Sequence, residues 1–333
     1  MARAARGCRR GDTADREARI THRRPHRRRG GRVTTAADAG TPVRSAGAGP
    51  HPRLSVNQAT IKYAPLRQAL DIVAGAGIGA IGTWREPVAE VGLAEAVRMV
   101  ADSGLRVSSH CRGGFFTLPP GAARQQALDD NRRAIDETAA LAAAGAPGSA
   151  PVLVLVAGGL PEGSRDLVGA RGRVADALAD LVPHALDAGV RLAVEPLHPM
   201  YAADRAVVST LAQAIDLAAP FPAAAVGVVV DTFHVWWDPA LEGSIARAGA
   251  AGRIASYQVC DWLTPIAADP LLSRGYPGDG HVDFGPVTEA VVAAGYTGDV
   301  EVELFNQAIW DTPAAQVVAR VVQAFGAAVP LPR

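Results

Sequence analysis

The sequence of 333 residues predicts an α/β protein with a (β/α)8 barrel. Short β-rich runs alternate with Ala-rich segments of helical period from residue 54 onward, and the alternation repeats roughly every 30 to 40 residues, as expected for βα units. Eight such units fit into the chain, and a barrel of this class usually has that size. An open, doubly wound sheet is the alternative, but residues 60–65 (TIKYAP) contain no glycine-rich phosphate-binding turn.

The predicted strands are short and apolar. The runs VLVLVA (152–157) and AVGVVV (225–230) are apolar throughout, as expected for parallel strands that are covered on both faces. Amphipathic stretches at 121–144 and 175–188 predict helices between strands. The eight predicted strands span residues 54–61, 78–83, 105–110, 152–157, 190–195, 225–231, 253–259 and 299–304.

Charge is distributed unevenly along the chain, although the formal net charge is zero. Residues 1–53 contain fourteen arginines and four acidic residues, whereas the remaining chain has 19 basic and 29 acidic residues. We expect residues 1–52 to form a disordered, Arg-rich leader, because like charges repel and few apolar side chains are available for burial. We expect residues 53–328 to form the barrel, whose negative charge disfavours a nucleic-acid partner.

The cysteines and the lengths of the apolar runs indicate in which cellular compartment the protein is expected. Cys8, Cys111 and Cys260 form no CxxC pair, so the sequence predicts neither a disulfide framework nor a thiolate metal site. Apolar runs fall short of the roughly 20 residues that a membrane span needs, and residues 1–53 lack the apolar centre of a secretory signal. We therefore expect a cytoplasmic protein with no membrane partner, and a homo-oligomer is compatible with the sequence.

Polar side chains lie at the ends of four consecutive predicted strands. Glu195 ends the fifth strand, Asp231 ends the sixth and Gln258 lies near the end of the seventh. Glu301 and Glu303 in the eighth strand are two residues apart, so both face the same side. Because the C-terminal ends of barrel strands meet at one mouth, we expect these groups to lie together.

A divalent cation explains this cluster better than four separate structural roles. Taken singly, Asp231 could cap the next helix, Glu195 could form an ion pair and Gln258 could be a satisfied core amide. Burying several carboxylates without a counter-charge is costly, however, and one cation serves all of them. Three carboxylates and an amide oxygen suit Mn²⁺ or Mg²⁺.

Five segments of the sequence resemble the sugar phosphate isomerase/epimerase superfamily, whose members have a xylose isomerase-like barrel. The segments are VEPLHPMY (194–201), VVDTFHVWWDP (229–239), YQVCDWLTP (257–265), GDGHVDF (278–284) and VEVELFN (300–306). The similarity extends over residues 54–325 and implies a small-molecule sugar or polyol substrate.

The resemblance also implies a ligand set. Ketose 3-epimerases of this superfamily hold their metal with Glu, Asp, His and Glu, which correspond to Glu195, Asp231, Gln258 and Glu303 here. Mn²⁺ or Mg²⁺ is preferred, and Co²⁺ or Zn²⁺ is compatible. Gln258 departs from the epimerase pattern, and relatives similar to inosose dehydratases also have an amide at this position, so the reaction type stays open.

Four further residues are candidates for substrate binding. The resemblance assigns this role to His234, which follows the strand-six aspartate, and to Arg274, although Arg274 could also be a solvated loop charge. His110, at the predicted end of the third strand, and His198 could reach the same mouth, or could instead orient a carboxylate ligand.

The sequence therefore predicts a metal-dependent sugar isomerase or epimerase that works through an enediolate. Glu195 and Glu303 are the expected catalytic acid and base. An inosose-type dehydratase and a non-catalytic sugar- or metabolite-binding barrel are the alternatives. Lys62, the only lysine, leaves Schiff-base aldolase chemistry open, whereas an endonuclease would require more inward histidines than the chain offers.

Overall fold

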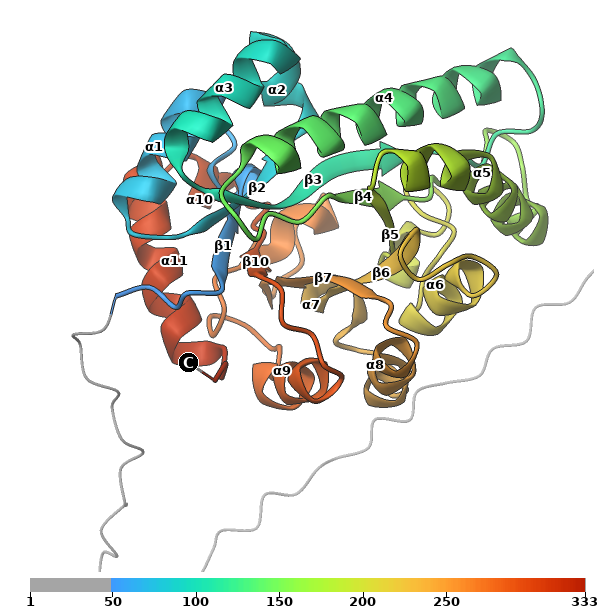
Figure 1. The fold of residues 1–333 in the computed structure, drawn as a ribbon. Coiled ribbons are helices and arrows are strands. Elements are labelled where there is room, and N and C mark those ends of the chain that lie inside the picture. The colour runs from blue at the N-terminus through green and yellow to red at the C-terminus, as the bar shows by residue number, and fades with distance from the viewer. Residues whose placement is uncertain (1–48, 333) are drawn as a thin grey trace, which may run out of the picture. The chain divides into compact units, whose positions relative to one another are not determined.

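Eight parallel strands close into a barrel with the order β1-β10-β7-β6-β5-β4-β3-β2 (Figure 1). The computed structural model describes residues 49–332. The closed ring confirms the predicted (β/α)8 barrel and excludes the open, doubly wound sheet. The predicted disordered leader lies outside the described residues, apart from residues 49–52.

Each predicted strand overlaps one strand of the barrel. The strands are β1 (Leu54–Asn57), β2 (Ala80–Trp84), β3 (Arg106–Gly114), β4 (Val152–Val156), β5 (Arg191–Glu195), β6 (Val226–Asp231), β7 (Ile254–Val259) and β10 (Val300–Val302). β1 is shorter than predicted because the Asn57 side chain accepts a hydrogen bond from the backbone N–H of Ala59 and turns the chain into a 3-10 helix, Gln58–Ile61. β3 extends four residues past the predicted end.

Helices surround the barrel and cover its outer face (Figure 1). The longer ones are α1 (Leu66–Gly75), α3 (Leu93–Ser103), α4 (Ala122–Ala144), α5 (Leu167–Asp187), α6 (Leu211–Ala218), α8 (Leu241–Ala250), α9 (Phe284–Ala293) and α11 (Ala314–Ala328). α4 matches the predicted helix, and α5 begins eight residues earlier than predicted. Among the described residues, no helix has both the length and the apolar character needed to cross a membrane.

The strands alternate between two apolar environments. Most buried apolar side chains form one cluster that includes the inner faces of the helices. A second, small cluster contains Val152, Val154, Ala193 and Val229. Ala193 precedes Glu195 by two residues and Val229 precedes Asp231 by two, so these side chains share the inward face of the barrel. Small apolar residues thus fill the part of the barrel interior that β4, β5 and β6 face.

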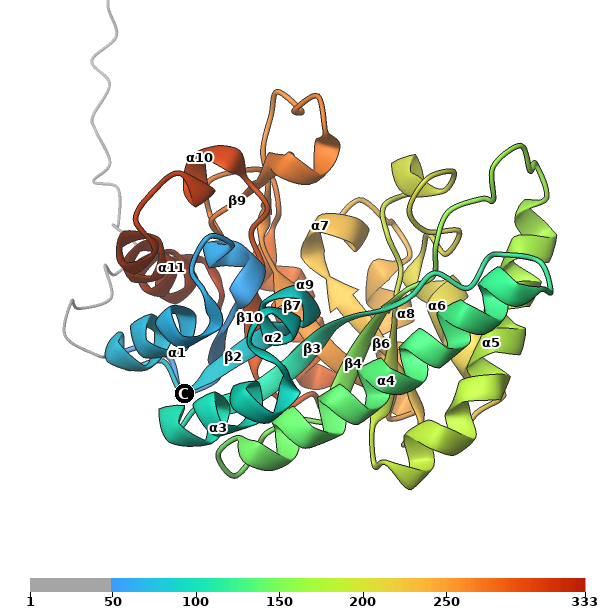
Figure 2. The ribbon, with the colours of Figure 1, turned by 90° about the horizontal axis from the view of Figure 1, so that it is seen from above.

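Short elements that follow the strands form the mouth of the barrel. α7 (Thr232–Val235) begins directly after β6, α10 (Gln307–Trp310) follows β10, and α2 (Arg85–Val91) follows β2. After β7, the strands β8 (Asp261–Trp262) and β9 (Arg274–Gly275) pair antiparallel. Figure 2 shows α7, β9 and α10 at the same end of the barrel.

Candidate active site at the barrel mouth

A cavity of about 640 Å³ lies at the C-terminal ends of the strands. Five polar side chains that are at most 6% exposed line it: Gln58, Glu195, His234, Arg274 and Glu303. Trp84 and Phe305 contribute aromatic surface. A concave site of this volume with a few convergent polar groups is typical of small-molecule binding.

Asp231 belongs to the site and caps a helix at the same time. Its Oδ1 accepts a hydrogen bond of 2.8 Å from the backbone N–H of Phe233 at the start of α7. Its Oδ2 accepts one of 2.9 Å from Arg274. The helix-cap interpretation of Asp231 is therefore confirmed, and the second carboxylate oxygen still reaches the other charged groups because each oxygen has a separate partner.

Three carboxylates from different strands meet at this site. Carboxylate oxygens of Glu195 and Asp231 lie within 4.8 Å of each other and of a ring nitrogen of His234. Glu303 follows β10 and reaches the same region, since one nitrogen of Arg274, Nη1, donates to both Asp231 Oδ2 and Glu303 Oε2 at 2.9 Å. The predicted convergence of the ends of β5, β6 and β10 is thus observed.

Burial changes the proton affinity of these carboxylates. Burial raises the pKa of Glu195 well above its usual range, and repulsion from Asp231 and Glu303 adds to the shift. Burial raises the pKa of Glu303 to about 8, although Arg274 opposes the shift. Burial also raises the pKa of Asp231, again against the effect of Arg274. The pKa of Glu303 therefore lies close to neutral pH, where acid/base catalysis requires a group that exchanges protons.

Arg274 lies inside the carboxylate cluster. Its side chain is 2% exposed, and its guanidinium carbon lies 4.8 Å from the ring centroid of Phe233 and 5.1 Å from that of Phe305. The β8–β9 pairing and a 3.0 Å hydrogen bond from Asn306 Nδ2 to the Arg274 carbonyl hold its backbone. The interpretation of Arg274 as a solvated loop charge is therefore wrong.

His234 faces two hydrogen-bond donors. The backbone N–H of His198 lies 3.2 Å from Nδ1, and Arg274 Nη2 lies 3.0 Å from Nε2. Burial, together with the nearby Arg274 charge, lowers the pKa of His234 well below its usual range, which leaves the imidazole neutral. A neutral imidazole has one lone pair on nitrogen, so only one of these contacts can be a hydrogen bond at a time. The contact with Arg274 can consequently be exchanged for a substrate group.

The other two predicted histidines do not line the cavity. His110 is fully buried in the middle of β3; its Nδ1 lies 2.9 Å from Thr83 Oγ1, and its Nε2 lies 3.5 Å from a carboxylate oxygen of Glu137 on α4. The expected position of His110 at the mouth is wrong because β3 continues to Gly114. His198 packs against the rings of Trp237 and Trp262 and reaches the site only through its backbone N–H.

Lys62 lies at the rim of the cavity, away from the carboxylates. It is exposed, and its Nζ lies 4.4 Å from the ring centroid of Trp310. It therefore does not occupy the barrel interior, where a strand would place a Schiff-base lysine.

The sequence that forms this barrel matches a known family. Residues 70–325 match the family model described as a xylose isomerase-like TIM barrel. This chain belongs to that family. A curated relative, the 3-dehydroshikimate dehydratase of Pseudomonas putida, is 30% identical over 161 residues. That match covers 46% of this chain and 24% of the dehydratase, so the chain spans only about a quarter of the relative.

Three solved structures are similar to this member of the xylose isomerase-like family. Protein SMc04130 from Sinorhizobium meliloti 1021 is 47% identical, with a TM-score of 0.78 and coverage of 83% of this chain and 98% of that one. The IolI protein with a bound zinc atom is 20% identical (TM-score 0.71; 83% and 98% covered). D-psicose 3-epimerase in the presence of D-fructose is 16% identical (TM-score 0.65; 82% and 97% covered). The last two similarities concern the fold alone.

The residues present fit the divalent ion that the xylose isomerase-like family implies. Glu195, Asp231 and Glu303 carry three negative charges when they are deprotonated, whereas Arg274 supplies one positive charge to this buried cluster. Gln258 adds a buried amide oxygen that has no hydrogen-bond partner within residues 49–332. Bound protons compensate the buried carboxylates when no ion is present. A divalent ion would compensate the same carboxylates and would also be coordinated by the amide oxygen.

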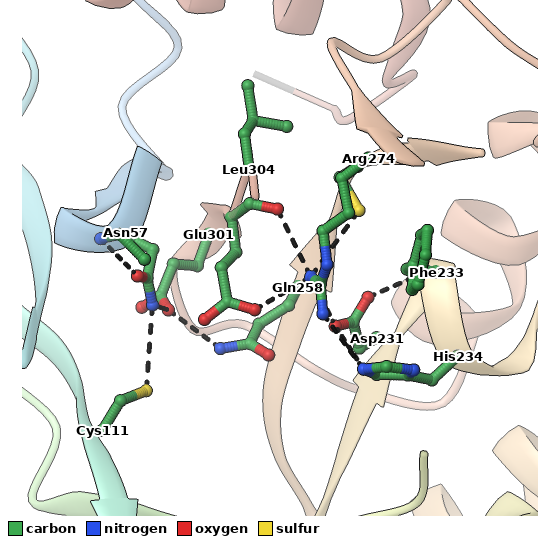
Figure 3. Close-up of polar contacts among 12 residues, drawn as sticks. Asn57, Cys111, Asp231, Phe233, His234, Gln258, Arg274, Glu301 and Leu304 are labelled. Atoms are coloured by element: carbon green, nitrogen blue, oxygen red, sulfur yellow. Dashed lines mark hydrogen bonds and ion pairs between the residues drawn. The ribbon is translucent and has the colours of Figure 1, made fainter. Parts of the chain in front are cut away.

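Glu301, two residues before Glu303, has a role that the sequence analysis did not assign. Glu301 faces inward, as its spacing from Glu303 predicted, but it does not line the cavity. Its carboxylate contacts Asn57 and Gln258 (Figure 3). It also contacts two serines of β3. Polar residues within apolar strands, such as Ser108 and Ser109 in β3, are the sequence signal that could have indicated this network.

Proposed function

We propose that this protein is a divalent-metal-dependent isomerase or epimerase of a small sugar or a related hydroxy-carbonyl compound. The observation that carries the proposal is the pair of cavity-lining glutamates, Glu195 and Glu303, whose pKa values burial has raised. A carboxyl group with a raised pKa can take up and return a proton during catalysis, and proton transfer next to a carbonyl is the step that these reactions share.

Glu195 and Glu303 act as the acid/base pair. In the barrel, β6 and β7 separate β5 from β10, so the two carboxylates approach a bound substrate from different sides. One removes the proton from the carbon beside the carbonyl, which leaves an enediolate, and the other supplies a proton. Return to the opposite face of the same carbon gives epimerisation, and return to the neighbouring carbon gives aldose–ketose isomerisation.

Glu195, Asp231, Gln258 and Glu303 would hold the ion. Four oxygen donors favour Mn²⁺ or Mg²⁺, and Co²⁺ or Zn²⁺ is compatible with them. The IolI protein, which has the same fold, binds a zinc atom, and this supports a metal in the present protein. When bound, a divalent ion supplies a Lewis acid that polarises the substrate carbonyl.

Arg274 and His234 bind and orient the substrate. Arg274 has two polar nitrogens at the cavity, and Phe233 and Phe305 hold its guanidinium in one orientation. His234 offers Nε2 to the same space once the Arg274 contact is exchanged. His198 holds His234 through its backbone, and we assign no substrate contact to His110.

Dehydration by the same machinery is the second candidate. Gln258 replaces the histidine expected for a ketose 3-epimerase, and the 30% identical curated relative is a dehydratase. Loss of a β-hydroxyl from the same enediolate would give this outcome. A metabolite-binding barrel without turnover is the non-catalytic alternative.

Proton exchange tests these functions before the product is known. The protein, supplied with Mn²⁺ in D₂O, is incubated with ketoses, aldoses, inososes and 3-dehydroshikimate, and deuterium at the carbon beside the carbonyl is followed by NMR. Exchange with retention of mass, apart from the added deuterium, supports epimerase or isomerase activity, and loss of water supports dehydratase activity. Binding of a compound without exchange anywhere in the panel would contradict the acid/base proposal.

A further inference from the structure

A buried carboxylate lies beside the proposed metal site without lining the cavity. Glu301 is 1% exposed and pairs in register with Gln258 of β7, which in turn pairs with Asp231 of β6. Four side chains donate hydrogen bonds to its carboxylate: Asn57 Nδ2 at 2.6 Å, Gln258 Nε2 at 2.9 Å, Ser108 Oγ at 2.5 Å and Ser109 Oγ at 2.9 Å. Both oxygens of Glu301 therefore act as acceptors.

The orientation of the Asn57 amide is fixed independently of Glu301. Its Oδ1 accepts hydrogen bonds from the backbone N–H of Ala59 at 2.9 Å and from Trp84 Nε1 at 2.6 Å. Neither group can accept a hydrogen bond, so the oxygen must face them and Nδ2 must face Glu301. Oε1 of Glu301 thus has a fixed donor on the side of β1.

The same carboxylate fixes the orientation of Gln258. Gln258 Nε2 donates to Glu301 Oε1, and a rotated amide would place its oxygen against that acceptor. Because nitrogen and oxygen point in different directions from the amide carbon, Oε1 of Gln258 faces away from Glu301 (Figure 3). That oxygen is buried and has no partner among the described residues. An unpartnered amide oxygen in such a place is a ready ligand for a cation.

We propose that Glu301 is a positioning residue that holds the Gln258 amide with its oxygen, and not its nitrogen, toward the carboxylate cluster. The consequence for metal binding rests on the function proposed above. An unrestrained glutamine could present its NH₂ group, which has no lone pair available for a metal, to the ion. Glu301 thereby makes the replacement of histidine by Gln258 compatible with a four-oxygen site.

Two substitutions of Glu301 distinguish the effect of its hydrogen-bond acceptor from the effect of its negative charge. Glu301→Gln removes the charge but can keep an oxygen toward Asn57 and Gln258, with its NH₂ group toward the serine hydroxyls, which can rotate to accept. Glu301→Leu removes both the charge and the acceptor. A difference between these variants therefore reports the hydrogen bond to Gln258.

The first readout needs no metal. In protein labelled with ¹⁵N-glutamine, the Gln258 side-chain amide is assigned by its loss in Gln258→Met. We expect its protons to be protected from exchange in the wild type and in Glu301→Gln, and to lose that protection in Glu301→Leu. Unchanged protection in Glu301→Leu would overturn the proposal.

The second readout is the affinity for Mn²⁺ in calorimetric titration of chelator-stripped protein. We expect Glu301→Leu to bind Mn²⁺ about 10- to 100-fold more weakly than Glu301→Gln, which is the usual effect of losing a group that orients a ligand. In the Gln258→Met background, this difference should vanish. Equal affinities of the two Glu301 variants in the native background would refute the inference and leave the metal site intact. Absence of saturable Mn²⁺ binding in the wild type would instead contradict the metal dependence in the proposed function, and the amide-protection result would still test the positioning.

A change at Gln258 keeps the proposal testable if Glu301→Leu does not fold. Gln258→Glu places a second carboxylate against Glu301 in place of the donor, whereas Gln258→Met only removes the donor. We expect Gln258→Glu to melt at a clearly lower temperature than Gln258→Met. Equal melting temperatures of the two variants would contradict the proposed pairing.

Discussion

Arg274 donates a 2.9 Å hydrogen bond to Asp231 in a region where neither side chain is more than 2% exposed. The same nitrogen also contacts Glu303. An arginine at this point neutralises part of a carboxylate cluster that burial would otherwise destabilise. The site therefore contains the positive charge of the Arg274 guanidinium in addition to the divalent metal ion that we propose.

Replacing Arg274 by Met should destabilise the metal-free protein and tighten Mn²⁺ binding. Breaking a buried ion pair costs about 3 to 5 kcal/mol, because the remaining carboxylates lose their partner. Removing a positive charge beside the ion removes repulsion, so the dissociation constant for Mn²⁺ should fall. Urea unfolding and calorimetry measure the two effects.

A surface arginine provides the matched control. Arg320 contacts Asp279 at 2.8 Å with a side chain that is 47% exposed, and Arg320→Met should cost at most about 1 kcal/mol. Similar losses in both variants, or weaker Mn²⁺ binding in Arg274→Met, would contradict the role assigned to Arg274.

Changing the carboxylates to amides should reduce deuterium exchange in two different ways. Glu195→Gln and Glu303→Gln remove a proton-transfer group, so deuterium exchange into a substrate should fall by about 100- to 10,000-fold and should not recover with excess Mn²⁺. Asp231→Asn removes charge from a ligand only, and part of its activity should return at high Mn²⁺ concentration. Exchange at the wild-type rate in both glutamate variants would refute the two-carboxylate mechanism.

Gly82 leaves the space that the Glu301 carboxylate occupies. A Cβ atom at residue 82 would lie 2.4 Å from Glu301 Oε2 and 2.5 Å from its Cδ. Gly82→Ala should therefore cost about 1 to 3 kcal/mol of unfolding free energy and weaken Mn²⁺ binding by displacing Glu301. Gly172→Ala is the control, because Gly172 is an exposed residue of α5 and a Cβ atom there meets nothing within 4 Å; the change should be neutral or slightly stabilising.

Stability should depend on pH in opposite ways with and without metal. The pKa of Glu303 rises to about 8 on folding, and those of Glu195 and Asp231 rise as well, so the native metal-free protein binds more protons than the unfolded chain. Its stability should fall as pH rises from about 4.5 to about 8. Metal binding requires deprotonated carboxylates, so the increase in melting temperature on adding Mn²⁺ should grow over the same range. A Glu303→Gln variant should show a shallower dependence, and a pH-independent metal effect in the wild type would argue against these carboxylates as ligands.

The predictable part of the site follows from strand periodicity. Glu195 and Asp231 end apolar strands, and Glu301 and Glu303 share one face, so a parallel barrel brings these residues to one mouth whatever its loops do. Gln258 was identifiable for the same reason. The barrel itself follows from eight alternating units, although β1 is shorter than predicted because the Asn57 side chain turns the chain.

The positions of His110, Arg274 and Glu301 depend on tertiary contacts that cannot be predicted from the spacing of residues in the sequence. His110 was expected at the mouth, but β3 continues past it and the side chain contacts Glu137 of α4 instead. Arg274 lies in a loop rich in glycine and proline, and only the β8–β9 pairing and two phenylalanine rings explain its burial. The role of Glu301 likewise depends on donors from three other strands.

A crystal of this protein soaked in Mn²⁺ tests the central claim most directly, through the anomalous scattering of the ion. We predict one anomalous peak per chain at the barrel mouth, within coordination distance of oxygens from Glu195, Asp231, Gln258 and Glu303. The amide nitrogen of Gln258 should still contact Glu301. No peak among these residues at saturating Mn²⁺, with Arg274 still bridging Asp231 and Glu303, would contradict the account.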